Sequence, residues 1–221
     1  MFRKPLVSRL ALLCFINVIV MATYNVLRLW FPQLSTIVEH SSLENKDMCD
    51  LLDEYTQRLK IASGNSTHSD VCVTTKSGNE TYINSIIIGC VCLLPYFITG
   101  VLVNKVGKKP LFITAGIISV GSTLGLRWAN TKAAIVALFS MAIAIAQIMV
   151  SLNQVVTVEV FPTTTRTLAI SLMMVSGRIG TLIGNIIFPI LLSMGCVVPF
   201  FTISGLMAGV TVLLLFLQTK K

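Results

Sequence analysis

Six long apolar runs constrain the fold of this chain more than any other feature of its sequence. They cover residues 10–31, 83–103, 111–128, 133–156, 168–192 and 197–217. About 20 mostly apolar residues are enough for a helix to cross the hydrocarbon layer of a bilayer. Lipid offers no hydrogen-bond partners to irregular backbone, so runs of this length span as helices. The sequence therefore predicts an all-α membrane protein, a single membrane domain over residues 1–221 with six transmembrane helices.

The charge content agrees with lipid as the main solvent. Only 12% of the 221 residues are charged, whereas 54% are hydrophobic, and a soluble domain carries about 25% charged residues. The net charge of +8 could indicate nucleic acid as a partner. The basic residues instead gather in small groups at the ends of the apolar runs, which is typical of topology signals. We therefore expect the lipid bilayer, and no nucleic acid, as a partner.

The basic groups predict an orientation. When the six runs are threaded in order, most of the basic residues outside the runs fall on one side, and the opposite short loop carries only Arg127 and Lys132. The basic side holds Arg3, Lys4, Arg9, Lys105, Lys108, Lys109, Arg166, Lys220 and Lys221. Cytoplasmic loops are enriched in Lys and Arg. Both termini are therefore expected in the cytoplasm, and the chain is expected in the plasma membrane or in a secretory or synaptic vesicle membrane.

The polar segment at about 32–82 then faces the outside or a lumen. Asn65 and Asn79 each begin a glycosylation acceptor pattern in it, and such patterns are used on that side. Cys49 and Cys72 lie in the same segment and would meet an oxidising compartment, which makes a disulfide between them plausible.

The remaining cysteines are assigned to apolar runs, where cysteine usually behaves as a small hydrophobe. They are Cys14, Cys90, Cys92 and Cys196. No spacing among the cysteines is typical of a zinc site, so no metal is expected.

The first run has an alternative interpretation. Basic residues precede it, and Val20-Met21-Ala22 could mark a signal-peptide cleavage site. The apolar run continues to Phe31, which is longer than a typical signal core and favours a transmembrane helix.

Four of the six runs carry a polar stripe. Residues three or four apart share a helix face, and polar faces avoid lipid. The rows are Asn17, Met21, Tyr24 and Arg28; Ser85, Gly89, Cys92, Tyr96 and Thr99; Ser140, Ala144, Gln147, Ser151 and Gln154; and Ser171, Met174, Arg178, Thr181 and Asn185. The pattern predicts a cavity between the first, second, fourth and fifth helices. For any single residue, a hydrogen bond between helices is the alternative.

The residues expected to bind substrate come from these rows. They are Asn17, Tyr24, Tyr96, Gln147, Ser151, Arg178, Thr181 and Asn185. Glycine pairs four residues apart permit close helix packing, and three occur: Gly121/Gly125, Gly180/Gly184 and Gly205/Gly209.

Arg178 stands out because it lies about ten residues into the fifth run. A cation near the middle of a bilayer costs about 2.5–3.5 kcal/mol on insertion scales, and no acidic residue occurs in the interior of the six runs. We expect Arg178 to point into the bundle or cavity. It could contact an anionic substrate group or act in gating, or it could form a structural pair with backbone carbonyls or with an acid on another chain.

Two segments on the basic side resemble motifs of the major facilitator superfamily. Residues 100–109 read Gly-Val-Leu-Val-Asn-Lys-Val-Gly-Lys-Lys and are similar to the motif Gly-x-x-x-Asp-Arg/Lys-x-Gly-Arg/Lys-Arg/Lys; residues 159–166 contain Glu-Val-Phe-Pro followed by Arg and resemble the loop before the eleventh helix of the family. The matching residues are Gly100, Asn104, Lys105, Gly107, Lys108, Lys109, Glu159, Pro162 and Arg166. The resemblance assigns them to cytoplasmic gating.

Physical chemistry suggests what several of these residues do. Gly100 would allow close approach, and Gly107 would allow a tight turn. Glu159 and Arg166 could link the loops by charge. Asn104 stands where the family has an acid; it could cap a helix start but lacks the charge that a helix dipole attracts, which weakens any inference of charge-relay gating.

The resemblance implies the C-terminal half of a major facilitator fold, closest to the synaptic vesicle glycoprotein 2 and organic-ion transporter-like branch. The six helices that precede it in that family are expected to be absent here. Two such bundles enclose a solute at the membrane midplane in the parent family, so a complementary six-helix half or a second copy is an expected partner.

The resemblance also implies a function. We expect a secondary transporter, or part of one, for a small organic solute with an anionic group, working by alternating access. No nucleophile–base set, metal cluster or phosphate loop occurs, so no enzyme activity and no cofactor are expected. The alternative is a non-transporting membrane glycoprotein, such as a vesicle component, receptor or adaptor, that acts through its outer loop.

Overall fold

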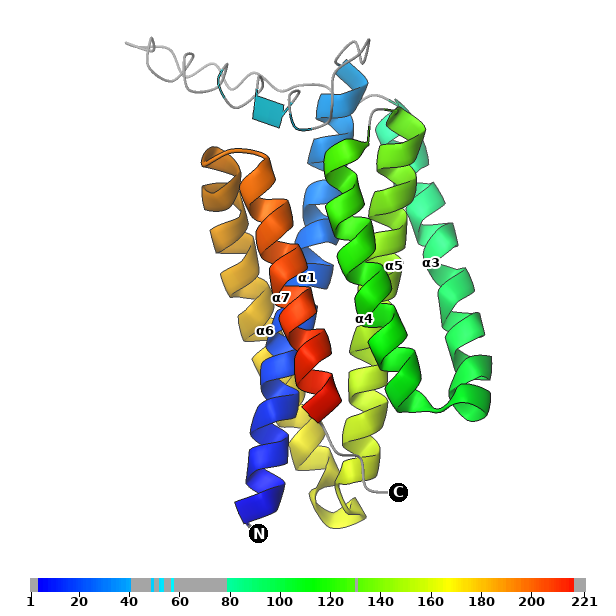
Figure 1. Ribbon diagram of the computed structural model, residues 1–221, viewed down its shortest axis with the longest axis vertical. Coiled ribbons are helices and arrows are strands. Elements are labelled where there is room, and N and C mark those ends of the chain that lie inside the picture. The colour runs from blue at the N-terminus through cyan, green and yellow to red at the C-terminus, as the bar shows by residue number, and fades with distance from the viewer. Residues whose placement is uncertain are drawn as a thin grey trace.

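The computed structural model describes residues 4–40, 79–129 and 131–216, together with residues 49, 52, 53 and 57. Six long helices run roughly side by side through the described chain (Figure 1). They are α1 (Lys4–His40), α3 (Asn79–Val106), α4 (Lys108–Gly125), α5 (Lys132–Val160), α6 (Thr163–Ser193) and α7 (Val197–Phe216), and a short 3₁₀ helix, Leu126–Trp128, follows α4. All six are long and apolar enough to span a membrane. The prediction of six transmembrane helices is confirmed.

The helices alternate in direction, so the bundle has two distinct ends. The start of α1 lies at the same end as the turns between α3 and α4 and between α5 and α6 (Figure 1). We call this the basic end, because Arg9, Lys105, Lys108, Lys109 and Arg166 lie near it. The other end carries the α6–α7 turn, and we call it the disulfide end for the bond described below.

The first helix is longer than predicted. The polar segment was expected to begin at Pro32, but α1 continues through Pro32 to His40. Leu34 and Ser35 remain buried beyond the proline, and the Thr36 hydroxyl donates a hydrogen bond to the Pro32 carbonyl at 2.8 Å. Proline is tolerated inside transmembrane helices where neighbouring groups satisfy the freed backbone. Packing on the far side of Pro32 therefore outweighs the local preference to end the helix.

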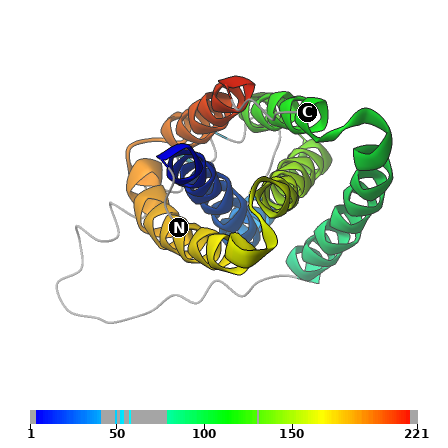
Figure 2. The same ribbon diagram turned by 90° about the horizontal axis from the view of Figure 1, so that it is seen from below.

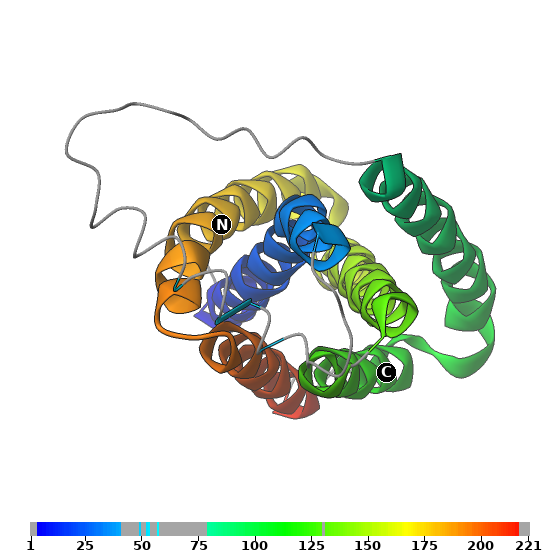
Figure 3. The ribbon, with the colours of Figure 1, turned by 90° about the horizontal axis from the view of Figure 1, so that it is seen from above.

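Helices α1 and α5 occupy the middle of the bundle, and the other helices surround them (Figures 2 and 3). Helix α1 packs most extensively on α6 and then on α5, whereas α4 packs on both α5 and α7. Three rings join α1, α5 and α7: Phe31 and Phe139 lie 5.6 Å apart, and Phe139 and Phe200 lie 6.2 Å apart, both edge to face. Helix α3 lies at the side of the bundle, and only 6% of its spanning window is buried.

The α1–α6 interface depends on glycine. A Cβ atom added at Gly180 would lie 2.4 Å from the Val18 carbonyl oxygen of α1, and one at Gly184 would lie 3.0 Å from the Val26 side chain. The expectation of close packing is confirmed for this pair. It is wrong for Gly121/Gly125 and Gly205/Gly209, since Gly121, Gly205 and Gly209 face open space and Gly125 makes only an ordinary contact.

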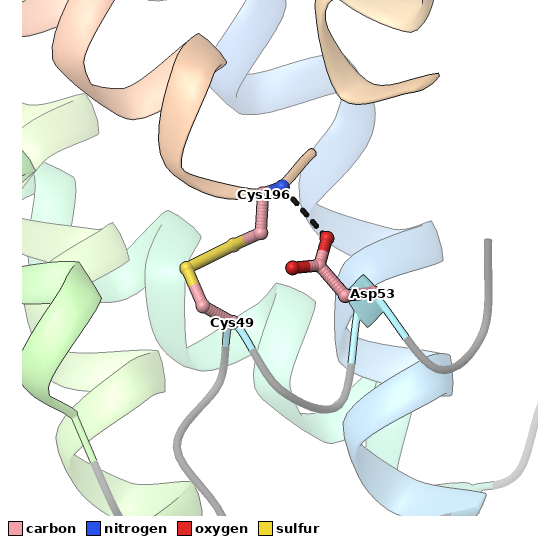
Figure 4. Close-up of a disulfide and its surroundings, with 3 residues drawn as sticks. All are labelled: Cys49, Asp53 and Cys196. Carbon is pink, nitrogen blue, oxygen red and sulfur yellow. Dashed lines mark hydrogen bonds between the residues drawn. A yellow bond between two sulfur atoms is a disulfide. The ribbon is translucent and has the colours of Figure 1, made fainter. Parts of the chain in front are cut away.

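The disulfide differs from the predicted one. Cys49 is bonded to Cys196, across a sequence separation of 147 residues, and not to Cys72, which lies outside the described residues (Figure 4). The Cys196 backbone N–H also donates a hydrogen bond to Asp53 Oδ1 at 2.9 Å. The apolar sequence around Cys196 predicts a small hydrophobe there, and this prediction is wrong. Gly195, with a φ of +127°, instead turns the chain between α6 and α7 and places Cys196 within bonding distance of the outer segment.

This pairing can be tested by mapping the disulfide. We expect a non-reduced proteolytic digest of the purified chain to contain a peptide in which Cys49 is linked to Cys196, and Cys196→Ser to remove it. Replacing the free cysteine Cys90, which is exposed on α3, is the matched control and should leave that peptide intact. A Cys49–Cys72 peptide in the wild type would contradict the structure.

Candidate functional site

The eight predicted substrate-binding residues do not converge on one cavity. Asn17 is 2% exposed, and its side-chain amide donates a hydrogen bond to the Met173 carbonyl of α6 at 2.6 Å. Asn153 of α5 donates to Asn17 Oδ1 at 3.4 Å and to the Leu13 carbonyl of α1 at 3.3 Å. Asn17 therefore belongs to a buried polar clasp between α1, α5 and α6, which is the helix-packing alternative.

Sequence reasoning missed Asn153, although it is fully buried. The chosen row on α5 ran through Gln147, Ser151 and Gln154, whereas Asn153 lies on the neighbouring side of the helix. Thr157 extends the clasp, because its hydroxyl donates to the Asn153 carbonyl at 2.8 Å. The only signal available in the sequence was the spacing of four between these two polar residues.

Thr181 and Asn185 take part in a second contact between α1 and α6. The Asn25 amide donates to Thr181 Oγ1 at 3.1 Å, and the Asn185 amide donates to the Thr181 carbonyl at 2.9 Å. Asn185 Oδ1 is buried without a partner among the described residues. Asn25 was also missed, although it follows Met21 of the predicted row by one turn.

The sequence predicts that Arg178 points into the bundle or a cavity, but Arg178 does not lie inside the bundle. Its side chain is exposed, whereas Gly177 and Gly180 beside it are buried against α1. Arg178 is displaced by about 100° around the helix from Gly177, since each residue turns a helix by that angle. The glycines, and not Arg178, therefore lie on the side of α6 that packs against α1.

The polar residues of α1 and α5 that remain make contacts within their own helices. Arg28 Nη1 donates a hydrogen bond to the Tyr24 hydroxyl at 3.0 Å, and the guanidinium carbon lies 5.9 Å from the centre of the Tyr24 ring. On α5, the Ser151 hydroxyl donates to the Gln147 carbonyl at 3.2 Å, while Gln147 Oε1 is buried and has no partner among the described residues. Tyr96 lies on α3, and its side chain is outside the described part of the structure.

A cavity of about 690 Å³ opens between α1, α3 and α5 in the half of the bundle nearer the disulfide end. Its lining is mostly apolar and includes none of the eight predicted residues. It is formed by Phe31, Leu34, Ser35, Ile87, Val91, Leu94, Lys132, Ala133, Ile135, Val136, Ala137, Phe139, Ser140, Met141, Ala144 and Ile145. Helix α6 contributes no residue to this lining. The cavity is therefore not the polar cavity between four helices that the sequence predicts. Among the described residues, no group of His, Cys, Asp and Glu could hold a metal ion.

The two motif segments meet at the basic end. Lys108, the first residue of α4, forms an ion pair with Glu159 near the end of α5. This differs from the expected Glu159–Arg166 link; Arg166 Nε is buried without a partner among the described residues. Pro162 immediately precedes α6 as its N-cap residue. The ion pair therefore joins the α3–α4 turn to the α5–α6 turn.

The glycines of the first motif have different environments. Gly107 has a φ of +88° and is the N-cap residue of α4, without a side-chain capping bond, so its predicted role in a tight turn is confirmed. Gly100 faces open space on α3, so no close approach requires it. Asn104 lies within α3, so it does not fill the capping role at a helix start that an Asn could take.

Comparison with known proteins identifies the family. A sequence model of the Major Facilitator Superfamily matches residues 75–221, which covers α3 to α7 and both motif segments. No curated protein matches the chain. Because the family match covers more than half of the sequence and the fold has six candidate membrane spans, the chain belongs to the Major Facilitator Superfamily of secondary transporters, which are membrane proteins and not enzymes.

Proposed function

We propose that the chain moves a small organic solute across the membrane by alternating access, with the Lys108–Glu159 ion pair as a contact that opens and closes at the basic end. The observation that carries this proposal is that the pair joins the two motif segments, which are far apart in the sequence. The Lys108 side chain is 27% exposed and the Glu159 side chain is 55% exposed, so the pair contributes little to stability. A weak contact of this kind can break during a transport cycle.

The orientation is part of the proposal. The basic end faces the cytoplasm, and the disulfide end faces the outside or a lumen, because basic residues mark cytoplasmic loops and disulfides form in oxidising compartments. The Cys49–Cys196 bond supports this orientation.

Glycosylation offers a test of that orientation. We expect Asn65, which lies outside the described residues, to carry a glycan, and glycosidase to shift the mobility of the wild-type chain but not of Asn65→Gln/Asn79→Gln. Asn79 is the first residue of α3, so Asn79→Gln alone should leave the shift unchanged. Protease protection that places the Cys49 segment in the cytoplasm would reverse the orientation.

The proposed solute carries an anionic group. Arg28 and Arg178 lie well inside the spanning helices, and the described spans contain no acid in their interior. An arginine in a region poor in water favours an anionic partner. Membership of the synaptic vesicle glycoprotein 2 and organic-ion transporter-like branch is a further proposal, which rests on Arg178 and on the outer segment with its two glycosylation acceptor patterns.

Transport itself can be tested with 2-naphthalenesulfonate, an organic anion that crosses bilayers poorly. We expect liposomes that contain the purified full chain to take up the radiolabelled probe faster than empty liposomes. We expect Arg178→Gln to abolish this uptake and Arg178→Lys to retain part of it, since lysine keeps the charge but loses the bidentate fork. Uptake is normalised to the amount of folded protein.

The outcomes separate the possible roles of Arg178. Normal uptake by Arg178→Gln would remove Arg178 from solute recognition. Loss of folded protein in both variants would indicate a structural role. Absence of uptake by the wild type would favour the non-transporting glycoprotein.

A further inference from the structure

The cavity between α1, α3 and α5 is suited to an apolar group. Its volume of about 690 Å³ lies within the range of pockets that hold drug-sized molecules. The walls are formed by aliphatic and aromatic side chains such as Phe31, Val91, Leu94 and Phe139, and Lys132 is the one charged residue among those that line it. A strongly hydrated solute would lose its hydrogen bonds to water there without replacement.

The hydroxyl groups of the lining do not change this conclusion. Ser140 Oγ donates to the Val136 carbonyl of its own helix at 2.7 Å, and Ser35 already takes part in an interaction. The cavity therefore offers contact area to a ligand rather than a set of free hydrogen-bond partners.

Polar groups gather where the cavity ends on the side of the basic end. Helix α1 runs toward the disulfide end, so Arg28 lies one turn before Phe31 and just beyond the cavity. Helix α5 runs the opposite way, so Gln147 lies about one turn after Ala144. The contacts Phe31–Phe139 and Asn17–Asn153 place it near the level of Tyr24, which accepts the hydrogen bond from Arg28. Gln147 Oε1 is buried without a partner among the described residues, and such an atom is costly unless water or a ligand supplies the missing bond.

Arg28 is positioned to receive an anion at this depth. The Tyr24 hydroxyl accepts one of its hydrogen bonds at 3.0 Å, and the guanidinium is close enough to the Cys92 thiol of α3 to interact with it electrostatically. Cys92 follows Val91, which lines the cavity. A guanidinium has five N–H donors in a planar fork, so the contact with Tyr24 leaves donors for a carboxylate or sulfonate.

We infer that this cavity binds the apolar body of an amphipathic organic anion, and that Arg28 binds its anionic group. The inference rests on the proposed function, since it names the class of solute, and it assigns the anionic group at this cavity to Arg28 of α1. The apolar body occupies the space between Phe31, Val91 and Phe139, while the anionic group lies at the level of Arg28 and Gln147.

Binding to the purified full chain in lipid nanodiscs tests this assignment without requiring transport. The probes are radiolabelled 2-naphthalenesulfonate and its neutral sulfonamide, which have nearly the same shape. We expect the wild type to bind the sulfonate at least about tenfold more tightly than the sulfonamide, as one net charge-assisted hydrogen bond would provide. Arg28→Gln should remove this preference by weakening only the sulfonate, and Arg28→Lys should keep part of it. Arg127→Gln, at a basic residue that does not line the cavity, should leave the preference unchanged.

The apolar part of the site needs a separate variant. Val91→Trp would fill the cavity from α3 and should weaken the binding of both probes by at least about tenfold. Leu93→Trp is the matched control, because Leu93 is exposed on the same helix and does not line the cavity. A melting temperature for each nanodisc sample shows whether the variants are folded.

Three results would overturn the inference: no saturable binding of the sulfonate to the wild type, loss of the preference in Arg127→Gln but not in Arg28→Gln, or unchanged binding by a folded Val91→Trp. Selective binding without uptake into liposomes would contradict the proposed function and leave this binding site in place. Uptake by the wild type, together with an unchanged preference in Arg28→Gln, would contradict this binding site and leave the proposed function in place.

Discussion

Gly180→Ala is expected to destabilise the bundle markedly, although alanine is the better helix former. The added methyl group would lie 2.4 Å from the Val18 carbonyl oxygen, which is backbone of α1 and cannot move aside as a side chain can. Overpacking of this kind costs about 1–3 kcal/mol, and sometimes more. It opposes a gain of about 1 kcal/mol from helix propensity. Because α1–α6 is the most extensive helix contact, we expect a net cost of about 2 kcal/mol, which lowers the melting temperature of a chain of this size by about 5 °C, and less folded protein.

The matched control for this substitution is Gly205→Ala in α7. Gly205 is also inside a spanning helix, and a Cβ atom there meets nothing within 4 Å. The same gain in helix propensity should then leave stability unchanged or slightly higher. Thermal unfolding of both variants in detergent, followed by size-exclusion chromatography, provides the measurement. Equal melting temperatures for the two would refute the close approach of α1 and α6.

Glu159→Lys is expected to reduce uptake of 2-naphthalenesulfonate by at least about tenfold while the chain remains folded. The change replaces an attraction to Lys108 with a repulsion, at a contact that we propose must form in one state of the cycle and break in another. An exposed pair contributes at most about 1 kcal/mol. Reversing its sign can move a two-state equilibrium by about one order of magnitude, with little effect on the melting temperature.

Exchanging the two charges separates the pair from the individual residues. Lys108→Glu combined with Glu159→Lys restores opposite charges and should recover most of the uptake. Lys109→Glu reverses the charge of the exposed residue beside Lys108, a change of the same size as Glu159→Lys and of opposite sign, and should have a smaller effect than Glu159→Lys. If the double variant transports no better than Glu159→Lys alone, the ion pair is not the gate contact.

The structure separates two kinds of polar residue that have the same appearance in the sequence. Asn17 and Tyr24 belong to one row on α1, yet Asn17 is fully enclosed between three helices and Tyr24 accepts a hydrogen bond from Arg28. A periodic row shows that residues share a helix face, but it does not show how far another helix covers that face. This is also why Asn25 and Asn153, which bond across helices, were not found by periodicity.

The number, approximate limits and order of the spanning helices could be predicted from the sequence, because span length and apolarity are local properties of a chain in lipid. The same is true of the turn at Gly107, which needs a positive φ, and of the two motif segments that identify the family.

The tertiary structure alone decided which distant residues meet. Cys196 had the local environment of a hydrophobic residue, and its bond to Cys49 exists because the α6–α7 turn brings it beneath a segment that lies 147 residues earlier. Lys108 meets Glu159 because α4 begins where α5 ends. The apolar cavity between α1, α3 and α5 follows from the position of α3 at the side of the bundle. Each of these features depends on how whole helices pack against one another, and the periodicity of a single helix carries no information about its neighbours.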